Sequence, residues 1–121
     1  QLQTQQLTCP GCLLIPQVGI RIICEPSQSN VLQWDQFTVY PKGKVVVRAR
    51  QSGDTMRLQG GSKSLKALMI DRKIPAKERN QIPVIADEDG VLAVWGLGAN
   101  IDRTCGGENP WQIRFEKIER M

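Results

Sequence analysis

The sequence contains no histidine and few aromatic residues, and these absences exclude several kinds of site. Without histidine the chain cannot assemble a Ser-His-Asp or Cys-His catalytic group, and it lacks the most common general base. Phe, Trp and Tyr make up 5% of the residues, which does not favour a platform along which the bases of a single strand stack. The acids of Asp87-Glu88-Asp89-Gly90 are typical of a turn between two apolar runs. We therefore expect no catalytic residue in this chain.

Long apolar runs and a secretion signal are also missing. No apolar stretch approaches the roughly 18 residues that cross a membrane, so we expect no membrane partner and a cytoplasmic location. The length of 121 residues fits a single domain, residues 1–121. Because the chain begins with Gln1 instead of Met, we expect a segment of a longer protein, and the Gln-rich start predicts irregular structure over residues 1–17.

Four cysteines are present, but their spacing does not favour a metal site. Cys9 and Cys12 form one C-x-x-C pair, whereas Cys24 and Cys105 stand alone. A zinc site needs a second such pair or histidines, and a thiol-redox pair would start a helix after a strand. We therefore expect no bound metal and reduced thiols.

Apolar alternation and β-branched runs predict about six strands. Pro41-Lys42-Gly43-Lys44 and the Asp87–Gly90 turn each predict a hairpin. The three tryptophans Trp34, Trp95 and Trp111 are expected in the core. The predicted strands are residues 18–25, 37–40, 45–50, 84–86, 91–95 and 111–118.

Two short helices are predicted in the middle of the chain. Leu65, Leu68 and Met69 form one apolar stripe over residues 65–73, which Ser62 or Ser64 can cap. Pro75 ends this helix and opens a second one over residues 75–81. On a helical wheel Lys63, Lys66 and Lys73 lie opposite the stripe, where three like charges repel unless an anion is present. Strands and helices together predict an α+β domain of layered, mixed sheets.

Basic charge is concentrated in one stretch. Residues 57–79 hold seven basic and two acidic side chains, a net charge of +5, whereas the rest of the chain is close to −1. The lysines near Gly60 suggest a nucleotide-binding loop, but Ser62 and Arg57 stand where a Walker loop needs glycine. Phosphates of a structured RNA fit this stretch better than ATP. A solvated, non-functional surface is the alternative.

Residues 45–103 carry an ordered series of motifs: a strand ending in Arg-x-Arg, then Gly-Asp, "SKSLKAL", "DRKIP", an arginine before "IPV", and a closing hairpin. In this order they resemble the C-terminal domain of bacterial tRNA(Ile)-lysidine synthetase. The resemblance implies a fold similar to a domain of the phenylalanyl-tRNA synthetase β subunit. The matching positions are Arg48, Arg50, Gly53, Asp54, Lys63, Lys66, Arg72, Lys73, Arg79 and Pro83. The sequence departs from the family at Thr55, where the family often has an arginine directly after Gly-Asp.

The resemblance also implies a function. The parent enzyme uses ATP and Mg²⁺ to join lysine to the wobble cytidine of a minor isoleucine tRNA, and its C-terminal domain holds the tRNA near the acceptor stem. The parent's Ser-Gly-Gly-x-Asp-Ser loop is absent here, so this chain is expected to be inactive alone and to hold no cofactor. The alternative is a structural module that docks on the catalytic domain or forms a homodimer.

The candidate RNA-binding residues are the basic ones of the motif region, although several allow a purely structural reading. Gly53-Asp54 is typical of a tight turn with an Asp-capped loop. Arg79 can pair with Asp71 or Asp87, and Arg48 and Arg50 are equally compatible with RNA contact and with ion pairs. The candidates are Arg48, Arg50, Arg57, Lys63, Lys66, Arg72, Lys73, Lys77 and Arg79.

Overall fold

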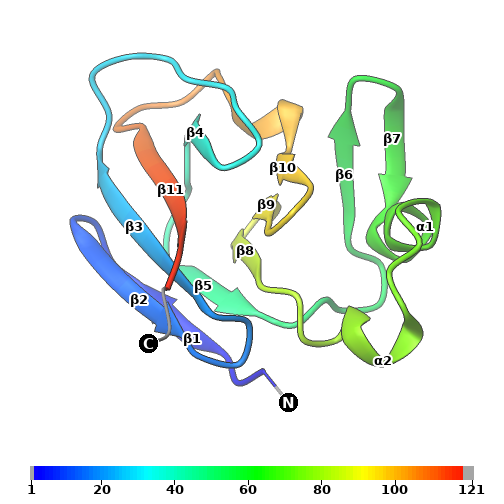
Figure 1. The fold of residues 1–121 in the computed structure, drawn as a ribbon. Helices are drawn as coiled ribbons and strands as arrows, with labels where there is room; N and C mark the ends of the chain where they lie inside the picture. Colours follow the sequence, from blue (N-terminus) through cyan, green and yellow to red (C-terminus); the bar gives the residue numbers. More distant parts are fainter. Residues whose placement is uncertain (1, 119–121) are drawn as a thin grey trace.

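Two antiparallel β-sheets face each other in the computed structural model, which describes residues 2–118 (Figure 1). The first sheet has the order β1(Gln5–Leu7), β5(Val45–Arg48), β8(Val84–Asp87), β9(Gly90–Val94), β10(Gly98–Ala99). The second has the order β2(Gly11–Ile15), β3(Ile20–Pro26), β11(Trp111–Lys117), β4(Gln36–Val39). The α+β class is confirmed. The described residues form eleven strands in place of about six, and their pairing is antiparallel instead of mixed.

The main core lies between these two sheets. Ile20 and Ile22 of β3 and Ile113 of β11 are fully buried, which confirms the alternation predicted for both strands. Phe37 and Phe115 meet edge to face with ring centroids 5.6 Å apart. Each fully buried side chain of this size contributes about 1.5–3 kcal/mol to folding, so the sheets form a stable support for the rest of the chain.

The predicted hairpin across Pro41–Lys44 is wrong. Both of its strands form, but β4 pairs with β11 in the second sheet, while β5 pairs with β1 and β8 in the first. The turn carries the chain from one sheet to the other. The irregular structure expected over residues 1–17 is also wrong for the described part of this stretch, because residues 2–17 contain β1 and β2. A local pattern predicts that a segment is extended, but its partner is decided by the burial available across the whole domain.

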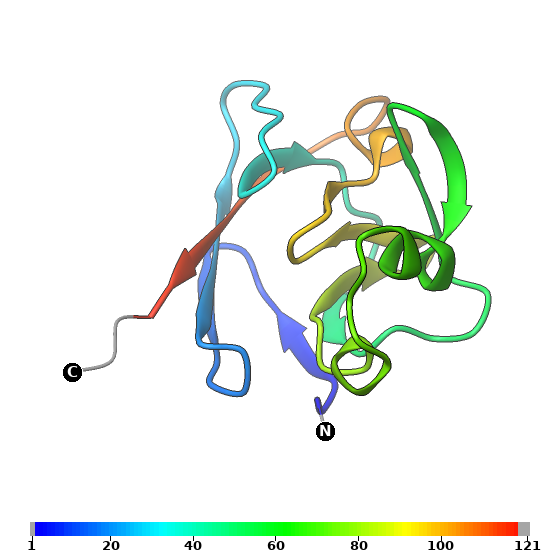
Figure 2. The same ribbon diagram turned by 45° about the vertical axis from the view of Figure 1, so that its right-hand side comes forward.

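A second, smaller layer covers the outer face of the first sheet. It consists of β6(Thr55–Leu58), β7(Gly61–Ser64), α1(Leu65–Asp71) and α2(Ala76–Arg79), and we call residues 55–79 the lobe. Figures 1 and 2 show the lobe on the side of the first sheet away from the second. Its own core joins Met56, Leu65 and Met69 to residues of β8 and β9. The strand β8 is therefore buried on both faces, which explains its unbroken apolar run.

The helix α1 begins and ends with specific capping bonds. Ser64 Oγ accepts a hydrogen bond from the N–H of Ala67 at 3.1 Å, so Ser64 is the N-cap. At the other end the Lys73 N–H donates to Ile70 O and the Ile74 N–H donates to Met69 O. This pair of bonds is a Schellman motif, and it places Lys73 in the left-handed conformation with φ of 58°. The helix is thus shorter than the predicted 65–73.

The conformation of Lys73 predicts that glycine is preferred at this position. A side chain at left-handed φ costs roughly 1–2 kcal/mol that glycine avoids, partly offset by the larger entropy that glycine loses on folding. Lys73→Gly is therefore expected to be more stable than Lys73→Ala by about 0.5–1 kcal/mol in urea unfolding. Both variants remove the same charge, so the difference isolates the backbone effect. Equal stability of the two would contradict the assignment of this cap.

Candidate nucleic-acid interface

Arg48, the first of the predicted RNA-binding residues, is buried and fully engaged. Its guanidinium donates to both Asp54 carboxylate oxygens, at 2.7 and 3.1 Å, and to Ala49 O at 3.0 Å. The side chains of Arg48 and Asp54 are only 10% and 11% exposed. Asp54 Oδ2 also accepts from the Gln51 N–H, which closes the Gly53-Asp54 turn as predicted. Arg48 therefore supports the loop and does not present its charge at the surface.

Two further candidates form ion pairs at the surface. Arg57 lies 3.3 Å from Asp102, and Lys63 Nζ lies 2.6 Å from Asp71 Oδ2. Lys63 belongs to β7 and not to the helix, so the predicted cluster of three lysines on one helix face is wrong. Exposed pairs of this kind contribute at most about 1 kcal/mol. They leave both cations accessible to a competing phosphate.

Arg50 and Arg79 are held in place through one nitrogen each. Arg50 Nε donates to Asn80 Oδ1 at 3.2 Å, and Arg79 Nε donates to the carbonyl of Ile74 at 2.9 Å. The predicted pairing of Arg79 with Asp71 or Asp87 is therefore wrong, because both acids are taken by other residues. No sequence pattern indicated Asn80, which lies 30 residues from Arg50 and orients it.

The remaining four candidates form no ion pair with any residue that the structure describes. Within residues 2–118 no carboxylate lies within 4.0 Å of the charged groups of these side chains, and all four are exposed on the lobe. Uncompensated cations gathered in one layer of the molecule repel each other and attract a polyanion. The four are Lys66, Arg72, Lys73 and Lys77.

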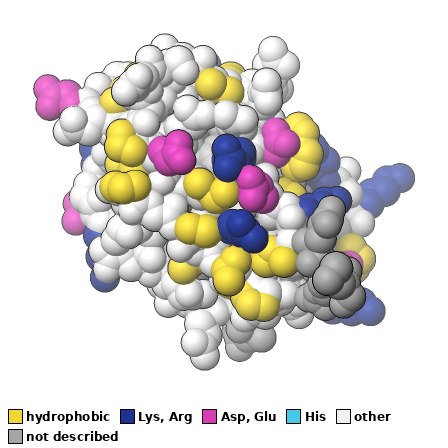
Figure 3. Space-filling model, turned by 60° about the vertical axis from the view of Figure 1, so that its left-hand side comes forward, with side chains coloured by type: hydrophobic (Ala, Val, Ile, Leu, Met, Phe, Trp, Pro, Cys, Tyr) yellow, Lys and Arg dark blue, Asp and Glu magenta, His cyan; other side chains and the backbone are white. Residues whose placement is uncertain are grey.

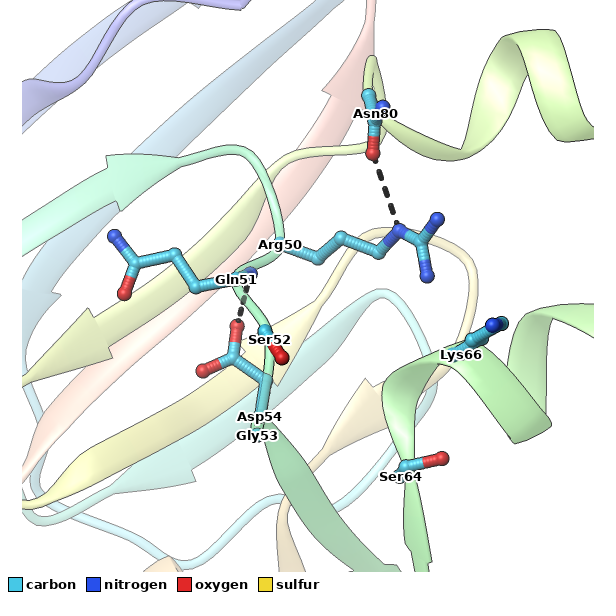
Figure 4. A pocket seen from close by; sticks show the side chains of 8 residues that line it. All are labelled: Arg50, Gln51, Ser52, Gly53, Asp54, Ser64, Lys66 and Asn80. Atoms are coloured by element: carbon cyan, nitrogen blue, oxygen red, sulfur yellow. Dashed lines mark hydrogen bonds between the residues drawn. The ribbon is translucent and has the colours of Figure 1, made fainter.

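A groove at the edge of the lobe brings Arg50 and Lys66 together. The loop after β5 and the start of α1 line it, and Figure 4 shows the Arg50 guanidinium between Asn80 and Lys66, with Gln51 turned away. Its one acidic lining residue, Asp54, is neutralised by Arg48. The hydroxyls of Ser52 and Ser64 also line the groove. This combination of two cations and two hydroxyls suits a phosphate group.

The opposite side of the molecule has a different character. Figure 3, turned to bring the left side of Figure 1 forward, shows acidic and basic side chains next to each other among apolar patches. Glu116 lies 3.8 Å from Arg21 and 3.0 Å from Arg114 on the outer face of the second sheet. Charge there is balanced locally, so the excess of unpaired cations belongs to the lobe.

The cysteines and Trp34 complete the account of the sequence candidates. Residues 2–118 contain no group of three or more His, Cys, Asp or Glu side chains that could hold a metal. Burial raises the pKa of the Cys9 and Cys24 thiols, which makes both poor metal ligands at neutral pH.

Trp95 and Trp111 pack against the core, but Trp34 is 55% exposed, so its predicted core position is wrong. No helix within residues 2–118 is long and apolar enough to cross a membrane.

Comparison with known families decides the relationship. The family model described as the TilS substrate C-terminal domain matches residues 45–115, which include β5, the whole lobe and most of β11. The chain belongs to this family. The resemblance found in the sequence motifs is thereby confirmed, and it extends beyond the motif region into the last strand.

Several curated proteins of the TilS family are similar to the chain. The tRNA(Ile)-lysidine synthase of Clostridioides difficile is 49% identical over 79 residues, which cover 64% of this chain and 17% of that protein. The synthase of Caldanaerobacter subterraneus is 35% identical over 101 residues, covering 76% of this chain and 21% of that protein. The bifunctional protein TilS/HprT of Listeria monocytogenes is 52% identical over 56 residues, covering 45% of this chain and 8% of that protein. The chain thus spans about a fifth of the length of the two synthases.

A solved structure agrees over nearly the whole chain. The crystal structure of a TilS C-terminal domain matches with a TM-score of 0.81 and 28% sequence identity, and the match covers 99% of this chain and all of that one. A unit of this extent therefore exists as a crystallised domain. The two sheets and the lobe described above are the TilS C-terminal fold.

Proposed function

We propose that this domain binds tRNA through the lobe and the adjoining groove, as the tRNA-holding part of a tRNA(Ile)-lysidine synthase. The observation that carries the proposal is the set of four exposed lobe cations without a carboxylate partner among the described residues. Arg50, and the ion-paired Arg57 and Lys63, extend this surface. Phosphate contacts of this kind position an RNA by its backbone and shape, with little reading of bases.

The lobe is suited to a structured RNA because its cations stand on a rigid support. Leu65, Leu68 and Met69 fix α1 against the first sheet, and Asp54 accepts the hydrogen bonds of Arg48 that hold the neighbouring loop. Cations at fixed spacing release counterions from several phosphates at once. We place the acceptor-stem region of a minor isoleucine tRNA on this surface and the reaction itself elsewhere in the parent enzyme.

The parent's chemistry lies outside this chain in our proposal. ATP and Mg²⁺ would be bound where the Ser-Gly-Gly-x-Asp-Ser loop resides, and lysine would be joined to the wobble cytidine there, in the cytoplasm. The Ser-Gly-Gly-x-Asp-Ser loop does not occur in this sequence, so we place neither Mg²⁺ nor ATP on this chain. The isolated chain is expected to bind tRNA without consuming ATP.

The binding role is tested by removing two unpaired lobe cations. Lys66→Gln with Lys77→Gln is expected to weaken tRNA binding by about tenfold and to reduce the slope of log K against log salt by about one per lysine. Fluorescence polarisation at several salt concentrations measures both effects. Lys44→Gln with Lys117→Gln is the matched control, because it removes the same charge outside the lobe. If both double variants lose the same amount of tRNA affinity, the loss comes from net charge alone, and the lobe is refuted as the binding surface.

A second candidate function is docking on another protein surface, either the catalytic domain or a second copy. It is favoured by Leu14, which is 52% exposed on the edge strand β2. An edge strand with an exposed apolar side chain is a common site of association. Sedimentation of Leu14→Lys beside the unmodified chain tests it, since a dimer through this edge would dissociate in the variant.

A further inference from the structure

An apolar groove on the other side of the lobe is distinct from the cationic groove at Arg50. It lies where the turn before β4, the β6–β7 turn and β10 meet, and it is an open depression of about 450 Å³. Such a volume lies within the range of small-molecule sites. The lining consists mainly of Leu32, Trp34, Leu58, Leu97 and Ile101, with Arg72 contributing the charge.

Trp34 lines this groove, and bonds of the neighbouring backbone hold it there. The Gln33 N–H donates to Gln36 O, which closes a tight turn with Trp34 near its tip, and the Phe115 N–H donates to Asp35 O. The Trp34 ring contacts Trp95 at a centroid distance of 5.6 Å, and Trp95 contacts Phe115 at 5.2 Å. The ring is thus anchored to the core on one side. More than half of the residue remains exposed.

The polar side chains that line the groove are of the kinds that bind the phosphate and the base of a nucleotide. Arg72 is fixed at the C-cap of α1 by its N–H bond to Leu68 O, and within residues 2–118 its guanidinium has no carboxylate within 4.0 Å. Gln33 and Gln59 add amide donors and acceptors for the edge of a base. No acidic side chain of the described residues lines the groove. Its charge therefore complements an anion, and its apolar wall complements the flat face of a base.

We propose that this groove holds one unpaired nucleotide of the bound RNA, with its base stacked on Trp34 and an adjacent phosphate paired with Arg72. The inference rests on the RNA-binding function proposed above and assigns to it a specific contact. A single exposed tryptophan provides one stacking position, which agrees with the scarcity of aromatic residues in the sequence. The site would give preference to an RNA whose stem ends in an unpaired segment over a fully paired one.

Two RNA hairpins test the proposal, one with a blunt stem and one with the same stem and a short single-stranded 3′ tail. The unmodified chain is expected to bind the tailed hairpin about tenfold more tightly, in line with the worth of one stacked base. Trp34→Leu is expected to lose this gain and to bind the blunt hairpin as before. Trp34→Phe, which keeps an aromatic face, should retain most of the gain, and Arg72→Gln should lose part of it. Lys117→Gln is the matched control for loss of one charge.

The outcomes separate this inference from the function on which it rests. If the unmodified chain binds neither hairpin, RNA binding itself is refuted and the groove assignment falls with it. If the chain binds both hairpins equally, or if Trp34→Leu weakens both to the same extent, the groove assignment alone is overturned. The same holds if Trp34→Leu converts a dimer to a monomer in sedimentation while leaving the affinity for the tail unchanged, because the groove is then occupied by a second copy.

Discussion

Arg48→Gln is expected to destabilise the domain by about 3 kcal/mol, because it leaves the Asp54 carboxylate largely buried without its cation. The two hydrogen bonds from Arg48 to Asp54 are lost together, and the loop that Asp54 organises through the Gln51 N–H loses its support. Urea unfolding followed by tryptophan fluorescence measures the change. In the folded fraction, RNA affinity should fall less than in Arg50→Gln, since Arg48 presents no charge at the surface and its loss only leaves the Asp54 charge beside the groove unneutralised.

Arg50→Gln, only two residues away, is the matched control and should behave in the opposite way. The Arg50 side chain is held by a single bond to Asn80 and faces the cationic groove. Its removal should cost less than about 1 kcal/mol of stability and weaken RNA binding several-fold. The double variant Arg48→Gln with Asp54→Asn should recover part of the lost stability, because no buried charge is then left alone. A stable Arg48→Gln variant with impaired RNA binding would reverse the roles assigned to the two arginines.

Asp87→Asn is expected to cost about 3 kcal/mol at neutral pH, since it leaves the Arg103 guanidinium without its anion. The Asp87 side chain is fully buried, and both of its oxygens accept hydrogen bonds from Arg103. Its carboxylate also accepts from the N–H groups of Lys42 and Asp89. It therefore joins the turn after β4, the β8–β9 turn and the helical turn at residues 101–103. Asp89→Asn, which affects only an exposed contact with Lys42, should change stability by less than about 1 kcal/mol.

The Asp87 site also predicts a dependence of stability on pH. Burial alone would raise the pKa of Asp87, but the hydrogen bonds from Arg103, Lys42 and Asp89 together with the Arg103 charge lower it below its ordinary value of 3.8. The unfolded chain then binds a proton more readily than the folded one, so the stabilisation is complete above the ordinary pKa and disappears as pH falls below it. Urea unfolding from about pH 7 down to about pH 3 should show a steeper loss for the unmodified chain than for Asp87→Asn. Parallel curves would contradict the assignment.

Much of the local structure follows from the sequence because its causes are local. The alternation of Ile20, Ile22 and Cys24 defines a strand with one buried face, and the β8–β9 hairpin follows from Asp-Glu-Asp-Gly between two apolar runs. The stripe of α1 and its cap at Ser64 are predictable for the same reason. The ordered motifs of residues 45–103 are sufficient to indicate the family, which the match over residues 45–115 confirms.

The partner of each charged side chain was decided only by the tertiary structure. Arg48 and Arg50 are indistinguishable in the sequence, yet one is buried against Asp54 and the other faces a groove beside Asn80. Lys63 resembles a helical lysine in a periodic pattern, but it lies on β7, opposite Met56 in the β6–β7 pairing, and meets Asp71. Charge partners of this kind are set by which surfaces pack together, and packing depends on burial summed over the whole chain.

The sequence by itself therefore determined the class of the fold, the family and the stretch in which basic charge is concentrated. The tertiary structure decided which of those charges are neutralised, which remain available to a phosphate, and that Trp34 lies beside Arg72 in a groove instead of in the core. The physical reason is that hydrophobic periodicity acts over neighbouring residues. The hydrogen bonds and ion pairs of the charged side chains depend instead on segments that come within a few ångströms of each other only once the sheets and the lobe have packed together.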